Sequence, residues 1–447
     1  MDLLKQQLKL INANLPLVDQ ENLCTLTIEN GLWTSITKQK GYIKEGEAND
    51  LENMDEATVL NLEGKILLPG LVDAHMHLDK AFSLQKVGNS SGTLEEAVEN
   101  YSYAVKDFSK QEIKSRIIRA ALMAVSFGTT AIRTHLDFHI RWGKEVAFRT
   151  IEAAIEAKNE LKTFVDIQLF PLTPFFHFIE EEINILEEAM QMGLTGFGGA
   201  PHLSQTPEKD IDIIFRLAEK YDCPIDFHTD ESDDPNVRTV NHIAKRTIDY
   251  GMKGRVTVDH LCSLAAMSNE DAEKMINKII EAGLKAVTLP GANLYLQGRH
   301  DSFPVRRGVT RVKELLSKGV PIATASDNIH DPFHPFGRGD LLQIGLITAY
   351  ATHMGSPTDI RTILKMITEI PANILGLNGY GISVGNKANF VIFDAITPEE
   401  LFTLLPERRW IYRNGGWLIV PGKQKSWNNP KIERLWSHSK SYMTLTL

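Results

Sequence analysis

Two histidines separated by one residue, His75 and His77, have a spacing that suggests metal chemistry. Side chains alternate between the two faces of a β-strand, so both imidazoles would lie on one face and could bind a single cation. His228 and Asp327, much later in the chain, are the natural candidates for the remaining ligands. Three nitrogens and one carboxylate leave a coordination position open for water, which is typical of catalytic rather than structural sites.

Two further side chains could transfer or hold protons near such a site. Glu231 follows His228 by three residues, and a carboxylate that does not bind the metal could carry a proton from water to a ring nitrogen. His260 could steady the attacking oxygen or polarise the leaving group. Taken alone, Glu231 could equally be a solvated loop acid and His260 a buried structural histidine.

The elements that must position these residues are short apolar runs, each followed by a segment of helical periodicity. Eight such runs alternate with helical segments, and five of them carry polar, chemically capable residues at their C-terminal ends. The runs are residues 67–77, 129–137, 164–171, 196–203, 224–231, 256–262, 285–293 and 321–328. Strand ends of this kind meet at one mouth of a parallel barrel, where active sites of that fold lie.

We therefore predict an α/β chain with a (β/α)8 TIM-type barrel over residues 68–377. A doubly wound sheet is the alternative, but no glycine-rich phosphate turn follows the first strand. Residues 1–67 and 378–447 contain short strand signals, and we predict that they pair into one small composite β-sandwich domain. Among these signals are Gly41-Tyr-Ile43 and the hairpin dipeptide Asn414-Gly415.

Composition narrows the class of protein. In 447 residues, 43% are hydrophobic and 23% charged, which excludes a disordered or fibrous chain. The net charge of −9 argues against nucleic-acid or anionic-membrane partners, and no apolar run is long enough to span a membrane. Three scattered cysteines do not form a disulfide framework. We expect a soluble, cytoplasmic homo-oligomer that acts on a small molecule.

The motifs that carry these residues resemble the amidohydrolase superfamily, and within it the cytosine deaminase branch. The segment Pro69-Gly-Leu-Val-Asp-Ala-His-Met-His77 is similar to the first strand of that superfamily. Four strings extend the likeness over most of the barrel: HTDESDD (228–234), DHLCSLAAM (259–267), NLYLQGRHDSFPVRRGVTRVKEL (293–315) and ASDNIHDPFHPFGRGDLLQ (325–343).

The resemblance implies one divalent metal ion per chain, zinc or iron, held by His75, His77, His228 and Asp327. It also implies that Glu231 shuttles protons, that His260 orients the nucleophile and that Asp327 accepts a proton from water as well as binding metal. Two-metal relatives carry a bridging lysine after the fourth strand. This chain has Ala200-Pro-His202 there, which favours a single ion.

Three departures from the cytosine deaminase pattern bear on the substrate. The chain has Phe170-Pro171-Leu172-Thr173 where those enzymes place a pyrimidine-binding glutamine, and Asp327-Asn328 where they tend to have two aspartates. Lys80 stands at an offset similar to that in N-isopropylammelide isopropylaminohydrolases. For substrate contacts we predict Lys80, Gln168, Asn328 and the aromatic ring of Phe333.

The predicted function is a metal-dependent hydrolytic deaminase or aminohydrolase, similar to cytosine deaminase, that removes an amine from a small nitrogen heterocycle. Such an enzyme hydrolyses non-peptide carbon–nitrogen bonds in cyclic amidines. One alternative is an N-alkyl aminotriazine aminohydrolase of the isopropylammelide type. Others are a cyclic-amide hydrolase of the dihydropyrimidinase or imidazolonepropionase type, and a non-catalytic binding barrel.

Overall fold

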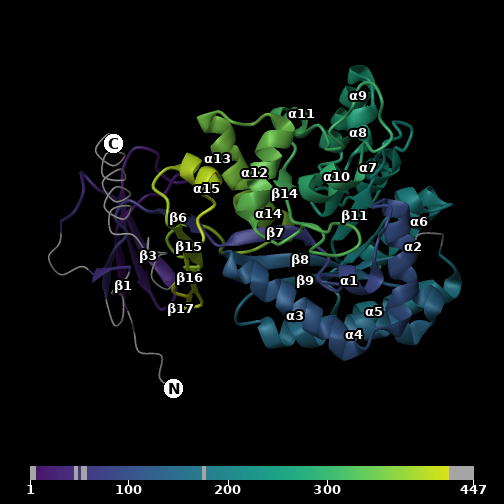
Figure 1. Ribbon diagram of the computed structural model, residues 1–447, viewed down its shortest axis with the longest axis horizontal. Helices are drawn as coiled ribbons and strands as arrows, with labels where there is room; N and C mark the ends of the chain where they lie inside the picture. Colours follow the sequence, from purple (N-terminus) through teal and green to yellow (C-terminus); the bar gives the residue numbers. More distant parts are fainter. Residues whose placement is uncertain (1–6, 45–48, 52–57, 174–177, 422–447) are drawn as a thin grey trace.

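The protein is described by a computed structural model covering residues 7–44, 49–51, 58–173 and 178–421. Parts of the predicted terminal domain, namely residues 1–6, 45–48, 52–57 and 422–447, lie outside the described residues. Strands from both chain ends lie together at one end of the molecule, and alternating strands and helices form the rest (Figure 1).

The middle of the chain forms parallel sheets, as predicted. A three-stranded and a five-stranded sheet contain the strands in sequence order, and every paired neighbour is parallel. The first sheet comprises β7 (Leu71–Met76), β8 (Thr129–Asp137) and β9 (Asp166–Leu172). The second comprises β10 (Phe197–Gly199), β11 (Ile225–Thr229), β12 (Val256–His260), β13 (Lys285–Thr288) and β14 (Ile322–Thr324).

Backbone hydrogen bonds join the two parallel sheets at both of their edges. Thr195 N donates to Leu169 O at 2.8 Å, just before β10, and Asp327 N donates to His75 O at 2.9 Å. The second contact matters most for function, because it brings the chain that follows β14 against the end of β7. Residues 252 positions apart in sequence are thereby placed side by side.

Helices connect the parallel strands and bury one face against them. On α3, Ile113, Ile117, Ala120 and Ala124 recur at helical spacing and are buried. The connecting helices are α1 (Leu84–Val87), α2 (Leu94–Ala104), α3 (Lys110–Ser126), α4 (Lys144–Leu161), α5 (Glu180–Gly193), α6 (Pro207–Lys220), α7 (Thr239–Asp249), α8 (Ser263–Ala266), α9 (Asn269–Glu281), α10 (Pro290–Leu296) and α11 (Val312–Ser317). After β14 come α12 (Leu341–Thr352), α13 (Pro357–Met366), α14 (Glu369–Leu375) and, later, α15 (Pro398–Leu404). Short 3-10 turns are η1 (Val105–Asp107), η2 (Ile140–Trp142) and η3 (Pro201–Leu203).

The chain ends supply two further sheets that share one apolar core. Leu10 and Leu26 from one sheet and Phe390 and Trp410 from the other are buried in the same cluster. The five-stranded sheet contains β1 (Leu8–Ala13), β2 (Cys24–Glu29), β3 (Leu32–Lys38), β4 (Asn49–Asp50) and β5 (Val59–Asn61). The four-stranded sheet contains β6 (Ile66–Pro69), β15 (Phe390–Phe393), β16 (Arg409–Arg413) and β17 (Gly416–Ile419).

Two local predictions are corrected by the structure. Residues 41–43 form no strand, because the side chain of Asn12 pairs with both backbone groups of Ile43, at 2.9 Å each. The run at 67–77 is two strands: β6 pairs with β15 of the terminal sheet and β7 pairs with β8. The change of sheet occurs at Gly70, where a Cβ atom would lie 2.3 Å from Thr130 Oγ1. Of the other local predictions, the Asn414-Gly415 turn is confirmed, with φ of 52° and 84°.

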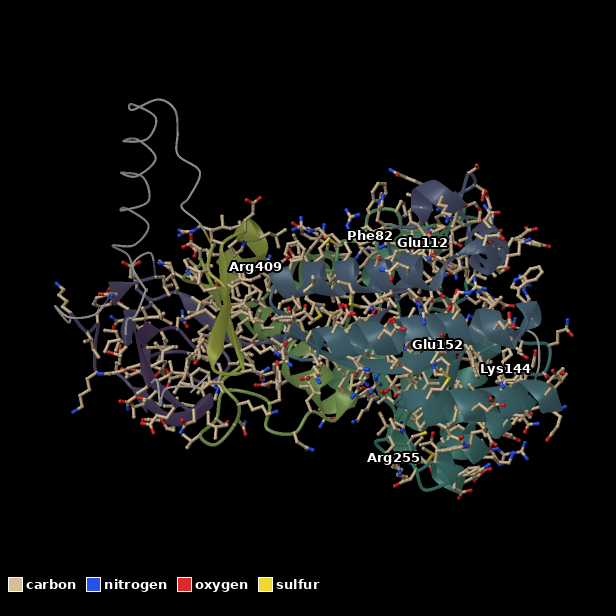
Figure 2. The ribbon with its side chains drawn as sticks, turned by 90° about the horizontal axis from the view of Figure 1, so that it is seen from below. Phe82, Glu112, Lys144, Glu152, Arg255 and Arg409 are labelled. Atoms are coloured by element: carbon tan, nitrogen blue, oxygen red, sulfur yellow. The ribbon has the colours of Figure 1, made fainter. Side chains whose placement is uncertain are left out.

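A buried ion pair ties the terminal sheet to the parallel part of the chain. Arg409 on β16 binds Asp340 through two hydrogen bonds of 2.8 and 2.9 Å, and its Nη1 also donates to Phe127 O at 2.7 Å. Asp340 caps α12 by accepting from Leu342 N. Arg409 lies where the yellow strand layer meets the helices (Figure 2). Within the described part of the chain, no helix is both long and apolar enough to cross a membrane.

We predict that Arg409→Ala lowers the free energy of unfolding by about 2 kcal/mol or more, because buried Asp340 loses two short hydrogen bonds and keeps only Arg338, at 3.4 Å, as a cationic partner in the described part of the chain. Urea denaturation of the variant and the parent measures the difference. Lys274→Ala breaks an exposed pair with Glu270 and should cost less than about 1 kcal/mol. Equal losses in the two variants would contradict the structural role of Arg409.

Candidate metal centre and active site

The four predicted ligands meet at one point. His77 Nε2 lies 3.3 Å from His75 Nε2 and 3.1 Å from His228 Nε2. Asp327 Oδ1 lies 3.6 Å from His75 Nε2 and 3.4 Å from His77 Nε2. Ligand bonds of about 2.1 Å that make angles of about 90–120° at a five-coordinate ion place the ligand atoms about 3.0–3.6 Å apart, with one position left for water. The spacing of these atoms therefore fits one divalent ion.

The hydrogen bonds of the histidines leave Nε2 free to act as ligand. His75 Nδ1 lies 2.8 Å from Asp259 Oδ2, and His77 Nδ1 lies 3.1 Å from His135 O. Both acceptors require a hydrogen on Nδ1, so the Nε2 lone pairs point at one another. Neutral nitrogens facing each other in this way are stable only around a cation. This donor set is the observation that supports a metal.

Burial keeps the ligand histidines uncharged. It lowers the pKa of His75 to about 3 and lowers the pKa values of His77 and His228 well below the ordinary range. A metal ligand must be an unprotonated imidazole, so these shifts favour metal binding at neutral pH.

The backbone turns sharply at the strand ends that carry the site. His260, at the end of β12, has a φ of 63°, and Asp327, beyond β14, has a φ of 61°. Left-handed conformations are unusual for residues with a Cβ atom and concentrate at functional sites. Here Asp327 is held by its N–H bond to His75 O, and Leu261 N donates to Thr229 O at 2.9 Å. These bonds between neighbouring strands stabilise the turns.

Glu231 and His260 are joined by an asparagine beside the ligand cluster. Asn293 Nδ2, on α10, donates to Glu231 Oε1 and to His260 Nδ1, both at 3.1 Å. With Nδ1 accepting, His260 carries its hydrogen on Nε2, which is buried and has no partner in the described part of the chain. Burial raises the pKa of Glu231 to about 8. Glu231 therefore holds a proton at neutral pH.

Lys80 is a buried cation at the same cavity. Its Nζ lies 2.8 Å from Asp137 Oδ1 and 4.5 Å from the centre of the Phe333 ring. Burial opposes the charge, but Asp137 and Asp79 outweigh it and raise the pKa of Lys80. The side chain is therefore a fixed ammonium group beside an aromatic face.

A small cavity of about 40 Å³ touches most of these groups, although His75 and Asn293 lie behind its walls. Its walls include His77, His228, Glu231, His260 and Asp327, together with the predicted substrate contacts Lys80, Asn328 and Phe333. Asn328 is turned partly away, since its Nδ2 donates to Asp331 Oδ2 at 2.7 Å.

Gln168 does not join this site, which corrects the prediction of a substrate contact. Its Oε1 accepts from Arg133 Nε and Nη2 at 3.0 and 2.9 Å, and its Nε2 donates to Leu375 O at 2.7 Å. The amide is thus fully used in binding Arg133 and the end of α14. It is also absent from the residues that line the cavity in the described structure.

The structure adds two residues that sequence reasoning did not assign to the site. Asn293 ends the run 285–293 and opens the family-like string 293–315, and either feature could have suggested a role. His202 lines the cavity and its Nδ1 lies 3.1 Å from His228 O, while its Nε2 has no partner among the described residues. Its position beyond the fourth parallel strand was a usable signal.

A second group of possible ligands lies behind the first and supports it. His135, Asp226 and Asp259 are close to the Nδ1 side of His75. Asp226 Oδ2 is already bound by Arg133 Nη1 at 2.6 Å, and the ring of His135 stacks on that of His75 with centroids 4.2 Å apart. These contacts orient the ring of His75. We therefore assign His135, Asp226 and Asp259 to holding His75 in place, and not to a second metal site.

A parallel α/β fold with a buried His/Asp cluster at the C-terminal strand ends defines the class of protein. The model of the amidohydrolase family matches residues 101–411, and the chain belongs to this family. The likeness to solved structures indicates a TIM-barrel α/β fold. Family membership and relatives together support a hydrolase of carbon–nitrogen bonds.

Three relatives illustrate the likeness. The chain is 32% identical over 378 residues to N-isopropylammelide isopropyl amidohydrolase of Pseudomonas sp., covering 82% of this chain and 89% of that protein. It is 31% identical over 365 residues to pterin deaminase of Rhizobium rhizogenes, covering 80% and 82% of the two chains. The structure of 5-methylcytosine deaminase from Klebsiella pneumoniae, liganded with 5-fluorocytosine, is similar with a TM-score of 0.85, 28% identity and coverage of 95% and 100%.

We predict that Asp259→Asn weakens metal binding by about 10- to 100-fold, because the amide holds the His75 ring and its tautomer less well. Competition with a chromogenic chelator measures the affinity. Asp234→Asn makes the same chemical change at an exposed loop position and should leave the affinity unchanged. A parental affinity in Asp259→Asn would show that the carboxylate does not act on the ligand.

Proposed function

We propose that the protein is a metal-dependent hydrolytic deaminase or aminohydrolase that removes an amine from a small nitrogen heterocycle. The observation that carries the proposal is the convergence of three Nε2 atoms and Asp327 beside a protonated Glu231. This combination supplies a cation site, a proton acceptor and a proton donor in one buried cavity.

We assign the metal to His75, His77, His228 and Asp327. When bound, a divalent cation lowers the pKa of water and so supplies a nucleophile at neutral pH. Zinc and iron both suit imidazole and carboxylate ligands, and we propose one ion of either kind per chain.

The protein groups move the protons of the reaction. Water oxygen adds to the ring carbon that bears the amine, and Asp327 takes one water proton. Glu231 gives its proton to the adjacent ring nitrogen. The carbon–nitrogen bond then breaks as Asp327 passes its proton to the leaving amine, and the hydroxyl proton on the ring carbon returns to Glu231 and leaves a carbonyl in the product. The Nε2–H group of His260 donates a hydrogen bond to the attacking oxygen and so orients it.

The remaining cavity residues bind the ring. We propose that Lys80 contacts an oxo group or a negatively charged ring atom and that Phe333 stacks on the face of the ring. Asn328 would contact polar atoms at the edge of the ring. A buried ammonium next to the reaction centre favours electron-rich, oxo-substituted heterocycles over purely amino-substituted ones. Cytosine-like rings and ammelide-like triazines both meet this requirement.

An N-alkyl aminotriazine is the second candidate substrate. Lys80 favours it, as does the 32% identity to N-isopropylammelide isopropyl amidohydrolase. Cyclic-amide hydrolysis remains the alternative reaction, and it would open the ring instead of releasing an amine.

We also infer the full architecture. The two hydrogen-bonded junctions between the parallel sheets support a closed (β/α)8 barrel, and the core shared by the terminal sheets supports a β-sandwich. The domains would then be 1–67 with 378–447 and 68–377, with the first boundary moved to Gly70.

We predict that Glu231→Gln lowers kcat by about 100-fold or more, since an amide cannot deliver the proton. Metal content should stay the same. Because the pKa of Glu231 is raised to about 8, the acid holds its proton below that pH, and parental activity should fall as the pH rises through about 8. Steady-state rates measured from pH 6 to 10 test this loss of activity on the alkaline side, the alkaline limb of the pH profile.

Glu208→Gln, at an exposed position of α6, is the matched control and should keep the parental rate and pH profile. A Glu231→Gln variant with full activity and an unchanged alkaline limb would remove Glu231 from the mechanism.

We predict that the metal-loaded protein releases amine from at least one ring in a panel of cytosine, isocytosine, isoguanine, creatinine, ammelide and N-alkyl ammelides. Metal analysis of the same sample should give about one ion per chain, and exhaustive chelation should abolish the release. Mass spectrometry of the product tests whether the ring stays closed. Ring opening would favour the cyclic-amide alternative, and full activity after chelation would overturn the proposal.

A further inference from the structure

A second, much larger cavity adjoins the cavity at the candidate metal centre. It has a volume of about 460 Å³ and lies between α2, the η2 turn and the end of β9. We call it the outer chamber, and the 40 Å³ space at the metal ligands the inner cavity. Four apolar side chains line both spaces and form the wall between them: Leu94, Val98, Leu172 and Leu203.

The two spaces differ greatly in size. The inner cavity, at about 40 Å³, has room for a few water molecules and is too small for a heterocycle with the side chains as placed. The outer chamber falls within the range of about 300–1,000 Å³ that is usual for small-molecule sites. A ring at the metal ligands needs more room than the inner cavity has, and movement of the shared wall would supply it by joining the two spaces.

Three of the four wall side chains are less than fully buried. Leu94 and Val98 lie on α2, a helix of 11 residues in which only Ala97, Tyr101 and Ser102 are buried. Leu203, at the end of η3, is 39% exposed. Leu172 is buried on β9, so movement of the wall falls to the other three side chains.

A polar connection also runs between the two spaces. Lys80 lines the inner cavity and Asp137 lines the outer chamber, and they form the 2.8 Å ion pair described above. Asp137 Oδ2 also lies 3.0 Å from His139 Nε2, which faces the outer chamber. The buried charge of Asp137 is thus already balanced, and it adds no net charge to the outer chamber.

The rest of the outer chamber is apolar at its base and acidic at its rim. Phe138 and Ile140 are buried in its wall. Glu95 and Glu99 lie one turn apart on the exposed side of α2, Glu182 of α5 also lines the chamber, and Arg141 is the arginine among the described lining residues. Arg141 is itself hydrogen-bonded to Ser102. The rim therefore repels an anion and attracts a cation.

We propose that the outer chamber is a second substrate subsite, which holds an apolar substituent of the heterocycle and favours a neutral or cationic end over an anionic one. The proposal rests on the proposed function, because it places the ring in the inner cavity. It extends that function by naming the substrate class: a heterocycle with an alkyl or aminoalkyl group, larger than a bare pyrimidine.

A matched ligand series tests the subsite on the metal-loaded full chain. The probes are cytosine, 5-butylcytosine, 5-(4-aminobutyl)cytosine and 5-(3-carboxypropyl)cytosine, with affinity measured by titration calorimetry in the Glu231→Gln background, so that the probes are not consumed. We expect the butyl compound to bind about tenfold more tightly than cytosine, well within what burial of three methylene groups and one methyl group can supply. We expect the amino compound to exceed the carboxylate compound by roughly tenfold, with a smaller ratio at 0.5 M salt.

Paired variants test the origin of the charge preference. Glu95→Gln/Glu99→Gln should reduce the ratio of amino to carboxylate affinity to about twofold or less. The control Glu152→Gln/Glu156→Gln removes two glutamates with the same spacing from α4, outside both cavities, and should leave the ratio unchanged. Glu152 is labelled in Figure 2.

Equal affinities across the four probes, including no binding by any of them, would overturn the subsite, as would preference for the carboxylate. An unchanged ratio in Glu95→Gln/Glu99→Gln would also overturn the charge preference. Failure here is distinct from failure of the proposed function. Metal-dependent amine release from an unsubstituted ring would leave the reaction standing without the subsite, whereas substituent-dependent binding without amine release would leave the subsite standing without the reaction.

Discussion

The structure depends on a set of lone pairs that face one another in a buried place. His77 Nε2 lies 3.1–3.4 Å from His75 Nε2, His228 Nε2 and Asp327 Oδ1, Asp327 Oδ1 lies 3.6 Å from His75 Nε2, and burial keeps the histidines neutral. Lone pairs held so close repel one another, and a cation at their centre would remove that repulsion. The ends of β7 and β11 and the segment beyond β14 must therefore lie close enough to place their ligand atoms around one cation site.

The support for that site extends deep into the parallel sheets. Asp259 holds the ring of His75, and Arg133 binds Asp226 beside it. Arg133 is in turn held by Gln168, which binds Leu375 O. Residues that resemble substrate contacts in the sequence thus act as a scaffold behind the ligands. Polar groups in the interior of this fold orient the metal site as well as form it.

The cavity next to the ligands is small, and four apolar side chains separate it from the outer chamber. Burial strengthens the interactions between Glu231, Lys80 and the reacting ring, because less water screens them. The same burial raises the pKa of Glu231 to about 8, so the strengthened interactions and the proton supply have one cause. The cost is that substrate entry requires the wall beside α2 to move.

The sequence by itself determined the alternation of strands and helices, the placement of His75, His77, His228 and Asp327 at strand ends, and the amidohydrolase resemblance. The first two follow from local periodicity, since side-chain direction on a strand alternates with every residue, and the resemblance rests on the motifs that carry the ligands. Only the tertiary structure decided that Gln168 binds Arg133, that Asn293 joins Glu231 to His260 and that the run at 67–77 divides between two sheets at Gly70. Those outcomes depend on which distant groups come within hydrogen-bonding distance, and no local pattern records that.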